Sequence, residues 1–251
     1  AIELWTKAVE LHEGKHDSEL PFHCDNLAYL FEEVKRFPDA ERYRQKAMDG
    51  WGAQGQVLAA ANSAWWLGYD QFNQQKYALA ELSFKCSAEG YAQKKNQREE
   101  LANSLRWLSW AQYQQNHNLE ALDTVGKAIA ARRAYLKNKT SKKLAYDLDL
   151  QFEILRHERR YAEAETVIKQ AIVIFEMKDA KSASIPESYF KLGSLYQRAH
   201  RHSEAEAAFK KAAALFAGFK SKGDWLAEIQ NRLAVIHAEQ GKKVEASART
   251  A

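Results

Sequence analysis

The chain repeats itself at intervals of about forty residues. Five segments share an alanine, a larger residue four positions later and a small residue three positions after that. The leading alanines are Ala40, Ala80, Ala121, Ala164 and Ala205, spaced 40, 41, 43 and 41 residues apart. A fixed period of this length is typical of repeat architectures, in which each unit packs mainly against its neighbours.

A second pattern precedes most of these alanines by 13 residues, where a leucine is followed by a small residue. The pairs are Leu27-Ala28, Leu67-Gly68, Leu108-Ser109, Leu192-Gly193 and Leu233-Ala234. The fourth segment departs from the pattern, with Gln151-Phe152 at that place. The chain has only 3 Pro and 11 Gly, so we expect helices joined by short connections.

With these residues the chain resembles the tetratricopeptide repeat family over its whole length. The period of 39 to 43 residues is similar to that of the longer subclass, found in kinesin light chains and several bacterial regulators. The resemblance implies an all-α fold, a right-handed α-solenoid of antiparallel helix pairs. HEAT and armadillo repeats have similar periods, of about 40 to 47 residues, but do not combine these two patterns.

The register predicts a single solenoid over residues 1–251. Residues 1–20 would hold an unpaired second helix, because the series extends backwards to Ala1. Repeats are expected at about 21–60, 61–101, 102–144, 145–185, 186–226 and 227–251, the last with Ala246 as its leading alanine. A chain that starts in mid-repeat is expected to belong to a larger chain or assembly.

One short stretch matches a zinc-protease pattern. His12-Glu13-Gly14-Lys15-His16 reads H-E-x-x-H, in which two histidines on one helix face would bind zinc. The repeat register places this stretch after a helix end, and Gly14 disfavours a continuous helix. We therefore expect a polar connection between repeats, without a metal, a cofactor or catalysis.

Function is expected on the concave face, which the first helix of each pair lines in such solenoids. The resemblance implies that positions 2, 5, 6, 9, 12 and 13 face inward when the leucine is position 7. The stretches "WWLGYDQF" and "RWLSWAQY" make the middle of this face aromatic, as partner-anchoring surfaces often are. The expected partner-binding residues are Asn26, Tyr29, Trp65, Tyr69, Phe72, Arg106, Trp110, Tyr113, Asp149, Glu153 and Arg156.

Several of these rings could instead be core residues that pack one helix on the next. Basic residues also gather after the second helices and predict a basic rim: Lys94, Lys95, Arg98, Arg132, Arg133, Lys137, Lys139, Lys142, Lys143, Lys178, Lys181, Lys220 and Lys222. Cations at helix C-termini complement the helix dipole, so this rim does not require nucleic acid.

The sequence thus predicts a protein–protein interaction scaffold that binds a peptide or protein segment in an aromatic-lined groove. The alternative is a ligand-sensing regulatory domain of a larger signalling protein, such as a switch ATPase or a peptide-responsive regulator. An enzyme, a nucleic-acid partner and a membrane span are not expected. With only two cysteines, Cys24 and Cys86, a reduced, cytoplasmic compartment is the simpler expectation.

Overall fold

The computed structural model describes residues 1–13, 18–137, 139–219 and 223–250, with 242–250 described by their backbone alone. In these residues the chain is helical and contains no strand, which confirms the predicted all-α solenoid class. By its internal packing the chain divides into two compact units, Ala1–Asn138 and Lys139–Ala251.

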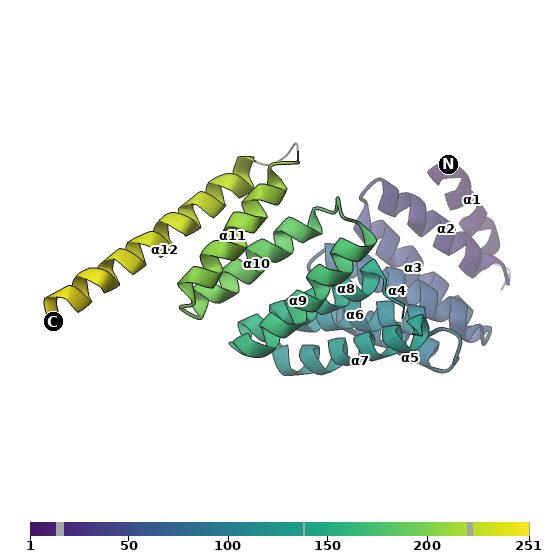
Figure 1. Cartoon of the computed structure of the whole chain (residues 1–251). Coiled ribbons are helices and arrows are strands. Elements are labelled where there is room, and N and C mark those ends of the chain that lie inside the picture. The colour runs from purple at the N-terminus through teal and green to yellow at the C-terminus, as the bar shows by residue number, and fades with distance from the viewer. Residues whose placement is uncertain (14–17, 138, 220–222, 251) are drawn as a thin grey trace. The chain divides into compact units, whose positions relative to one another are not determined.

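The first unit consists of one helix followed by three antiparallel helix pairs (Figure 1). Its helices are α1 (Ile2–Glu13), α2 (Leu20–Glu33), α3 (Phe37–Ala53), α4 (Val57–Asn73), α5 (Tyr77–Ala92), α6 (Arg98–Gln114) and α7 (Asn118–Leu136). The pairs α2–α3, α4–α5 and α6–α7 each pack closely, and consecutive pairs pack through α3–α4 and α5–α6.

The second unit contains two helix pairs followed by a long final helix (Figure 1). Its helices are α8 (Lys142–His157), α9 (Tyr161–Lys178), α10 (Ser184–Arg198), α11 (His202–Phe216) and α12 (Gly223–Thr250). Every described helix is too short or too polar to span a lipid bilayer.

The alanine series forms the buried seam of each pair. All five leading alanines are fully buried in the second helix of a pair. The larger residues that follow are buried too, Phe84 and Phe209 among them at 0% exposure. Burying apolar surface is the main favourable term for a helix too short to be stable alone, so this seam explains why the helices pair.

Two glycines of the leucine-small pairs allow paired helices to approach closely. A Cβ placed on Gly68 would lie 2.9 Å from the ring of Phe84, and one on Gly193 would lie 2.8 Å from the ring of Phe209. In the fourth pair the large and small residues are exchanged. The buried Phe152 takes the place of the small residue in the leucine-small pattern, and the smaller Ile168 takes the place of Phe84 and Phe209 in the alanine series. The irregular sequence there still forms a helix pair.

The turns inside the five pairs share one unusual residue. Lys35, Gln75, Asn116, Arg159 and His200 all have a positive φ, between 57° and 63°. Each lies five residues before its leading alanine. The next residue donates its N–H to a carbonyl five residues back, as in a Schellman C-cap. His200 therefore belongs to the α10–α11 turn, and His202 is the first residue of α11.

The expected sixth pair is a single helix. α12 continues through Gly241, which occupies the place of the five turn residues. From Gly241 to the end of the chain, Val244 is the one large aliphatic residue, so a returning helix would bury little apolar surface. The prediction of a sixth pair was wrong, while the single solenoid over 1–251 and its other repeat boundaries stay a prediction.

Candidate functional site

The predicted residues of α2 lie on a partly exposed helix face. Tyr29 is 49% exposed, and the neighbouring carboxylate of Glu33 raises its pKa. Asn26 is half-buried and donates its amide N–H to the Phe22 carbonyl at 2.9 Å. This amide still has a carbonyl oxygen available.

The predicted aromatic residues of α4 and α6 pack against one another. Trp65 and Tyr69 are stacked with ring centroids 5.8 Å apart, and Tyr69 meets Trp107 at 5.4 Å. Phe72 lies 5.3 Å from both Trp107 and Trp110. All five rings are half-buried and keep part of their surface exposed, and all but Trp110 pack against the core of this unit.

The polar members of this surface are engaged as well. The Arg106 guanidinium lies 5.2 Å from the ring centre of Trp107, within the range of a cation–π contact. Tyr113 is half-buried on the same helix. Whether these residues of the first unit bind a partner stays a prediction.

In the second unit the predicted residues of α8 form a charged cluster with Lys191 of α10. Lys191 Nζ lies 2.8 Å from Asp149 Oδ2 and 3.1 Å from Glu153 Oε1. Arg156 donates to Glu153 Oε2 at 2.7 Å. Burial works against ionisation of Glu153, but Lys191 and Arg156 outweigh it and lower the pKa of that carboxyl. Burial raises the pKa of Asp149 despite its contact with Lys191.

This cluster borders a cavity of about 400 Å³ between α8, α10 and α12. Its walls are Glu153, Arg156, Glu187, Phe190, Lys191, Ser194, Arg198, Trp225 and Arg232. A volume of this size falls within the range of side-chain and small-ligand pockets, about 300 to 1,000 Å³.

Six of the wall residues were not predicted from the sequence, although its register contains them. With Leu192 as position 7, Glu187, Phe190, Lys191, Ser194 and Arg198 occupy positions 2, 5, 6, 9 and 13. With Leu233 as position 7, Arg232 occupies position 6. The candidate residues predicted from the register extended only as far as the fourth repeat. Trp225 lies at the start of α12, outside the register, so the repeat pattern could not predict it as a wall residue.

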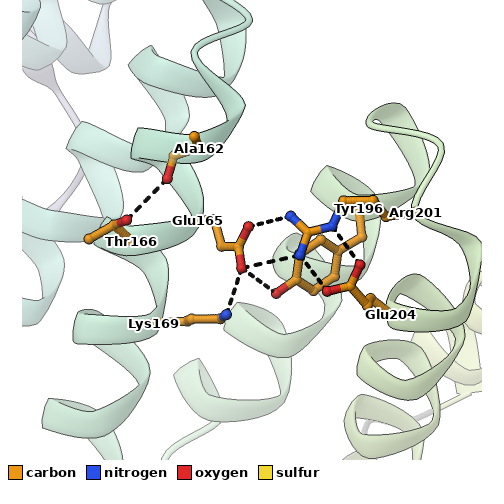
Figure 2. A network of polar contacts seen from close by, with 7 residues as sticks. All are labelled: Ala162, Glu165, Thr166, Lys169, Tyr196, Arg201 and Glu204. Carbon is orange, nitrogen blue, oxygen red and sulfur yellow. Dashed lines mark hydrogen bonds and ion pairs between the residues drawn. The ribbon is translucent and has the colours of Figure 1, made fainter.

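The second unit holds a different polar cluster, around Glu165 (Figure 2). Its carboxylate accepts hydrogen bonds from Lys169 Nζ at 2.6 Å and Tyr196 Oη at 2.9 Å, and it pairs with Arg201. The Arg201 bond, ahead of the others, lowers the pKa of Glu165 to about 2. Arg201 also forms an ion pair with Glu204.

The same link recurs between earlier repeats. Glu41 and Glu81 also follow a leading alanine, and they accept hydrogen bonds from Gln74 at 2.9 Å and Gln115 at 2.7 Å. Leu122 takes this place in the third pair. These carboxylates join consecutive helix pairs, and we assign them a structural role.

The zinc-protease pattern is only partly within the described residues, since Gly14, Lys15 and His16 lie outside them. α1 ends at Glu13, whose carboxylate pairs with Lys46 of α3. The His12 ring packs against His23, with centroids 4.5 Å apart. The described part of the pattern therefore serves packing between helices.

The expectation of a basic rim needs one correction. Arg132 is 1% exposed and donates to Asn103 Oδ1 at 3.0 Å, so it is a core residue of the first unit. Lys142 is paired with Asp179. Lys220 and Lys222 lie outside the described residues.

Comparison with known proteins agrees with the register. The model of the tetratricopeptide repeat family matches residues 153–217 and 185–249, which contain the cavity. The second unit contains tetratricopeptide repeats. A comparison of this repeat protein with curated proteins finds no match in sequence.

Solved structures extend the similarity to the first unit, as a likeness of fold. RapI in its apo form covers 97% of the chain, with a TM-score of 0.80 at 10% identity and 67% of its own length matched. YrrB, described as a TPR protein with an unusual peptide-binding site, covers 92% at a TM-score of 0.61 and 17% identity, over 100% of its own length. A putative kinesin light chain from Podosopora anserina covers 81% of the chain, with a TM-score of 0.64 at 14% identity and 97% of its own length matched.

Proposed function

We propose that this protein is an interaction module that binds a segment of a partner protein in the cavity between α8, α10 and α12. The observation that carries the proposal is the cavity itself. Eight of its nine wall residues occupy positions of the repeat register that face inward in such repeats.

The chemistry of the walls suits a peptide better than a flat protein surface. Phe190 and Trp225 supply an aromatic wall, and Arg198 and Arg232 supply donors. Aromatic residues and arginine are the side chains that most often dominate binding energy at interfaces. The peptide-binding site described for YrrB supports peptide binding by a protein of this fold.

The aromatic surface of α4 and α6 is a further candidate contact in the first unit. Its rings remain partly exposed, but no described feature defines what it would bind. The alternative function, a ligand-sensing regulatory domain, also stays a prediction. A cytoplasmic location is proposed on the weaker ground of the two unpaired cysteines.

The proposal is tested by filling the cavity. Ser194 lies on its wall, and Ser194→Trp would occupy space that a bound side chain needs. Ser203 is exposed on α11, so Ser203→Trp adds the same ring outside the cavity. We expect a phage-displayed library of random dodecapeptides to be enriched on the wild type and on Ser203→Trp, but not on Ser194→Trp. Equal enrichment on all three proteins would contradict the proposal.

A further inference from the structure

The cavity has two chemically different ends along α10. Glu187 lies in the first turn of this helix and Arg198 in the last, and both line the cavity. They are eleven residues apart, which corresponds to about 16 Å along the helix axis. Both charges complement the helix dipole, and each can still form an ion pair with a ligand.

At the first end an unpaired carboxylate lies beside aromatic rings. Glu187 forms no side-chain hydrogen bond or ion pair with any residue that the structure describes. Phe190 and Trp225 meet edge to face with centroids 5.2 Å apart. The nearby ammonium of Lys191 favours the charged form of Glu187, but its ion pairs are with Asp149 and Glu153. A carboxylate with adjacent aromatic surface is the environment that a lysine or arginine side chain favours.

Burial is the first cause of a raised pKa at Glu187, ahead of the opposing effect of Lys191. A half-buried carboxylate without a cationic partner is thus less stable in its charged form than in water. A cation brought by a ligand would remove that penalty, because it restores an opposite charge at a site already formed.

At the other end Arg198 offers an unpaired cation. The exposed Arg198 guanidinium has no ion pair within the described part of the chain, whereas Arg156 on α8 is engaged by Glu153. Arg232 donates its Nε to Glu228 at 2.7 Å. Arg198 is therefore the wall cation best able to take a carboxylate from a ligand.

We propose that the cavity selects a partner segment with a lysine or arginine side chain at the Glu187–Phe190–Trp225 end and a carboxylate side chain at Arg198. An extended chain covers about 3.3 Å per residue, so the two charged residues of the segment stand about five positions apart. This inference rests on the proposed function, because it specifies the ligand of the same cavity.

The test uses defined peptides rather than an unknown partner. The probes are acetylated, amidated hexapeptides with lysine and glutamate at the two ends, in both orders, and alanine and leucine between them. Matched peptides replace the lysine or the glutamate by glutamine, or shorten the spacing to two residues. Dissociation constants are measured for the wild type, Glu187→Gln, Arg198→Gln and the surface control Glu163→Gln.

We expect either glutamine replacement, and the short spacing, to weaken binding to the wild type and to Glu163→Gln at least fivefold. Glu187→Gln should lose the preference for lysine and keep that for glutamate, and Arg198→Gln should do the reverse. Thermal unfolding checks that each variant is folded.

Three results would overturn the inference: an unchanged lysine preference in Glu187→Gln, an unchanged glutamate preference in Arg198→Gln, or no binding of any hexapeptide. These outcomes are separate from failure of the proposed function. If Ser194→Trp abolishes enrichment from the random library, the cavity binds peptides even though its charge selectivity has been assigned wrongly. If Ser194→Trp has no effect there either, both proposals fail.

Discussion

Lys191 Nζ lies 2.8 Å from each carboxylate oxygen of Asp149, and this contact joins α10 to α8. Burial disfavours the ammonium, but Asp149 and Glu153 outweigh it and raise the pKa of Lys191. Lys191 is therefore charged at neutral pH. Its cluster with Asp149 and Glu153 forms the polar wall of the cavity, and the three side chains are each less than a third exposed.

Removing the ammonium should destabilise the second unit. Lys191→Met leaves Asp149 and Glu153 without their shared cation, and we expect a loss of about 2 kcal/mol in the free energy of unfolding. Lys191→Met combined with Asp149→Asn should recover most of this loss, since the uncompensated charge is gone. Urea denaturation at pH 7 measures both. A single variant as stable as the wild type would show that the cluster contributes nothing.

A buried carboxyl in the first unit should limit stability at neutral and alkaline pH. Asp70 is 0% exposed and neither of its oxygens accepts a hydrogen bond from the described residues. Burial first, and then the carboxylate of Glu32, raise the pKa of Asp70 to about 8. In the unfolded chain an aspartate ionises near pH 3.9.

The folded state therefore holds this proton between about pH 4 and pH 8, while the unfolded state has lost it. The stability of the wild type should fall as pH rises through this window. Asp70→Asn removes the effect, so we expect it to be more stable by about 2 kcal/mol at pH 7, with a gain that shrinks towards pH 4. The control Asp123→Asn alters an exposed carboxylate on α7 and should show no such trend. A gain that did not vary with pH would contradict the assignment to Asp70.

The close approach of paired helices gives a prediction with an internal control. A Cβ at residue 193 would lie 2.8 Å from the Phe209 ring, so Gly193→Ala should cost about 1 to 3 kcal/mol through overpacking. A Cβ on Gly126 in α7 would meet nothing within 4 Å. Gly126→Ala should instead stabilise the protein by about 0.5 to 1 kcal/mol, because alanine is the better helix former. Thermal or urea unfolding of the two variants should thus move in opposite directions.

The aromatic surface of the first unit can be assigned to packing or to binding by one substitution. Trp110 stacks on Trp107 with centroids 5.2 Å apart and also contacts Phe72. We expect Trp110→Ala to lower the free energy of unfolding by about 2 to 3 kcal/mol and to leave peptide binding unchanged. The opposite result, a binding loss of about 2 kcal/mol or more with little loss of stability, would make this surface a partner site.

The helix pairs could be predicted because the residues that pair them are spaced regularly and buried. Ala80, Phe84 and Ser87 lie on one face of α5 and are all buried, so their sequence pattern is the packing pattern itself. The turns could not be predicted in the same way. Five residues with side chains adopt the left-handed conformation there, although glycine is the residue that usually does so.

The candidate site was only half predictable. Glu153 and Arg156 were found because the register reaches the first helix of the fourth pair, and the same register leads to Phe190 and Ser194. Arg132 was predicted wrongly: a cation near a helix end is expected to be exposed, but this side chain is buried. Its burial depends on Asn103 of the preceding helix, a tertiary contact that the local sequence does not contain.

The central claim is that the partner segment binds between α8, α10 and α12. The most direct test is fluorine NMR of protein labelled with 5-fluorotryptophan, its seven tryptophan signals assigned by single replacements with phenylalanine. On addition of a peptide selected from the random library, we expect the Trp225 signal to shift and saturate, while the signals of Trp65, Trp107 and Trp110 stay in place. Saturating shifts of those three signals with an unchanged Trp225 would contradict the claim.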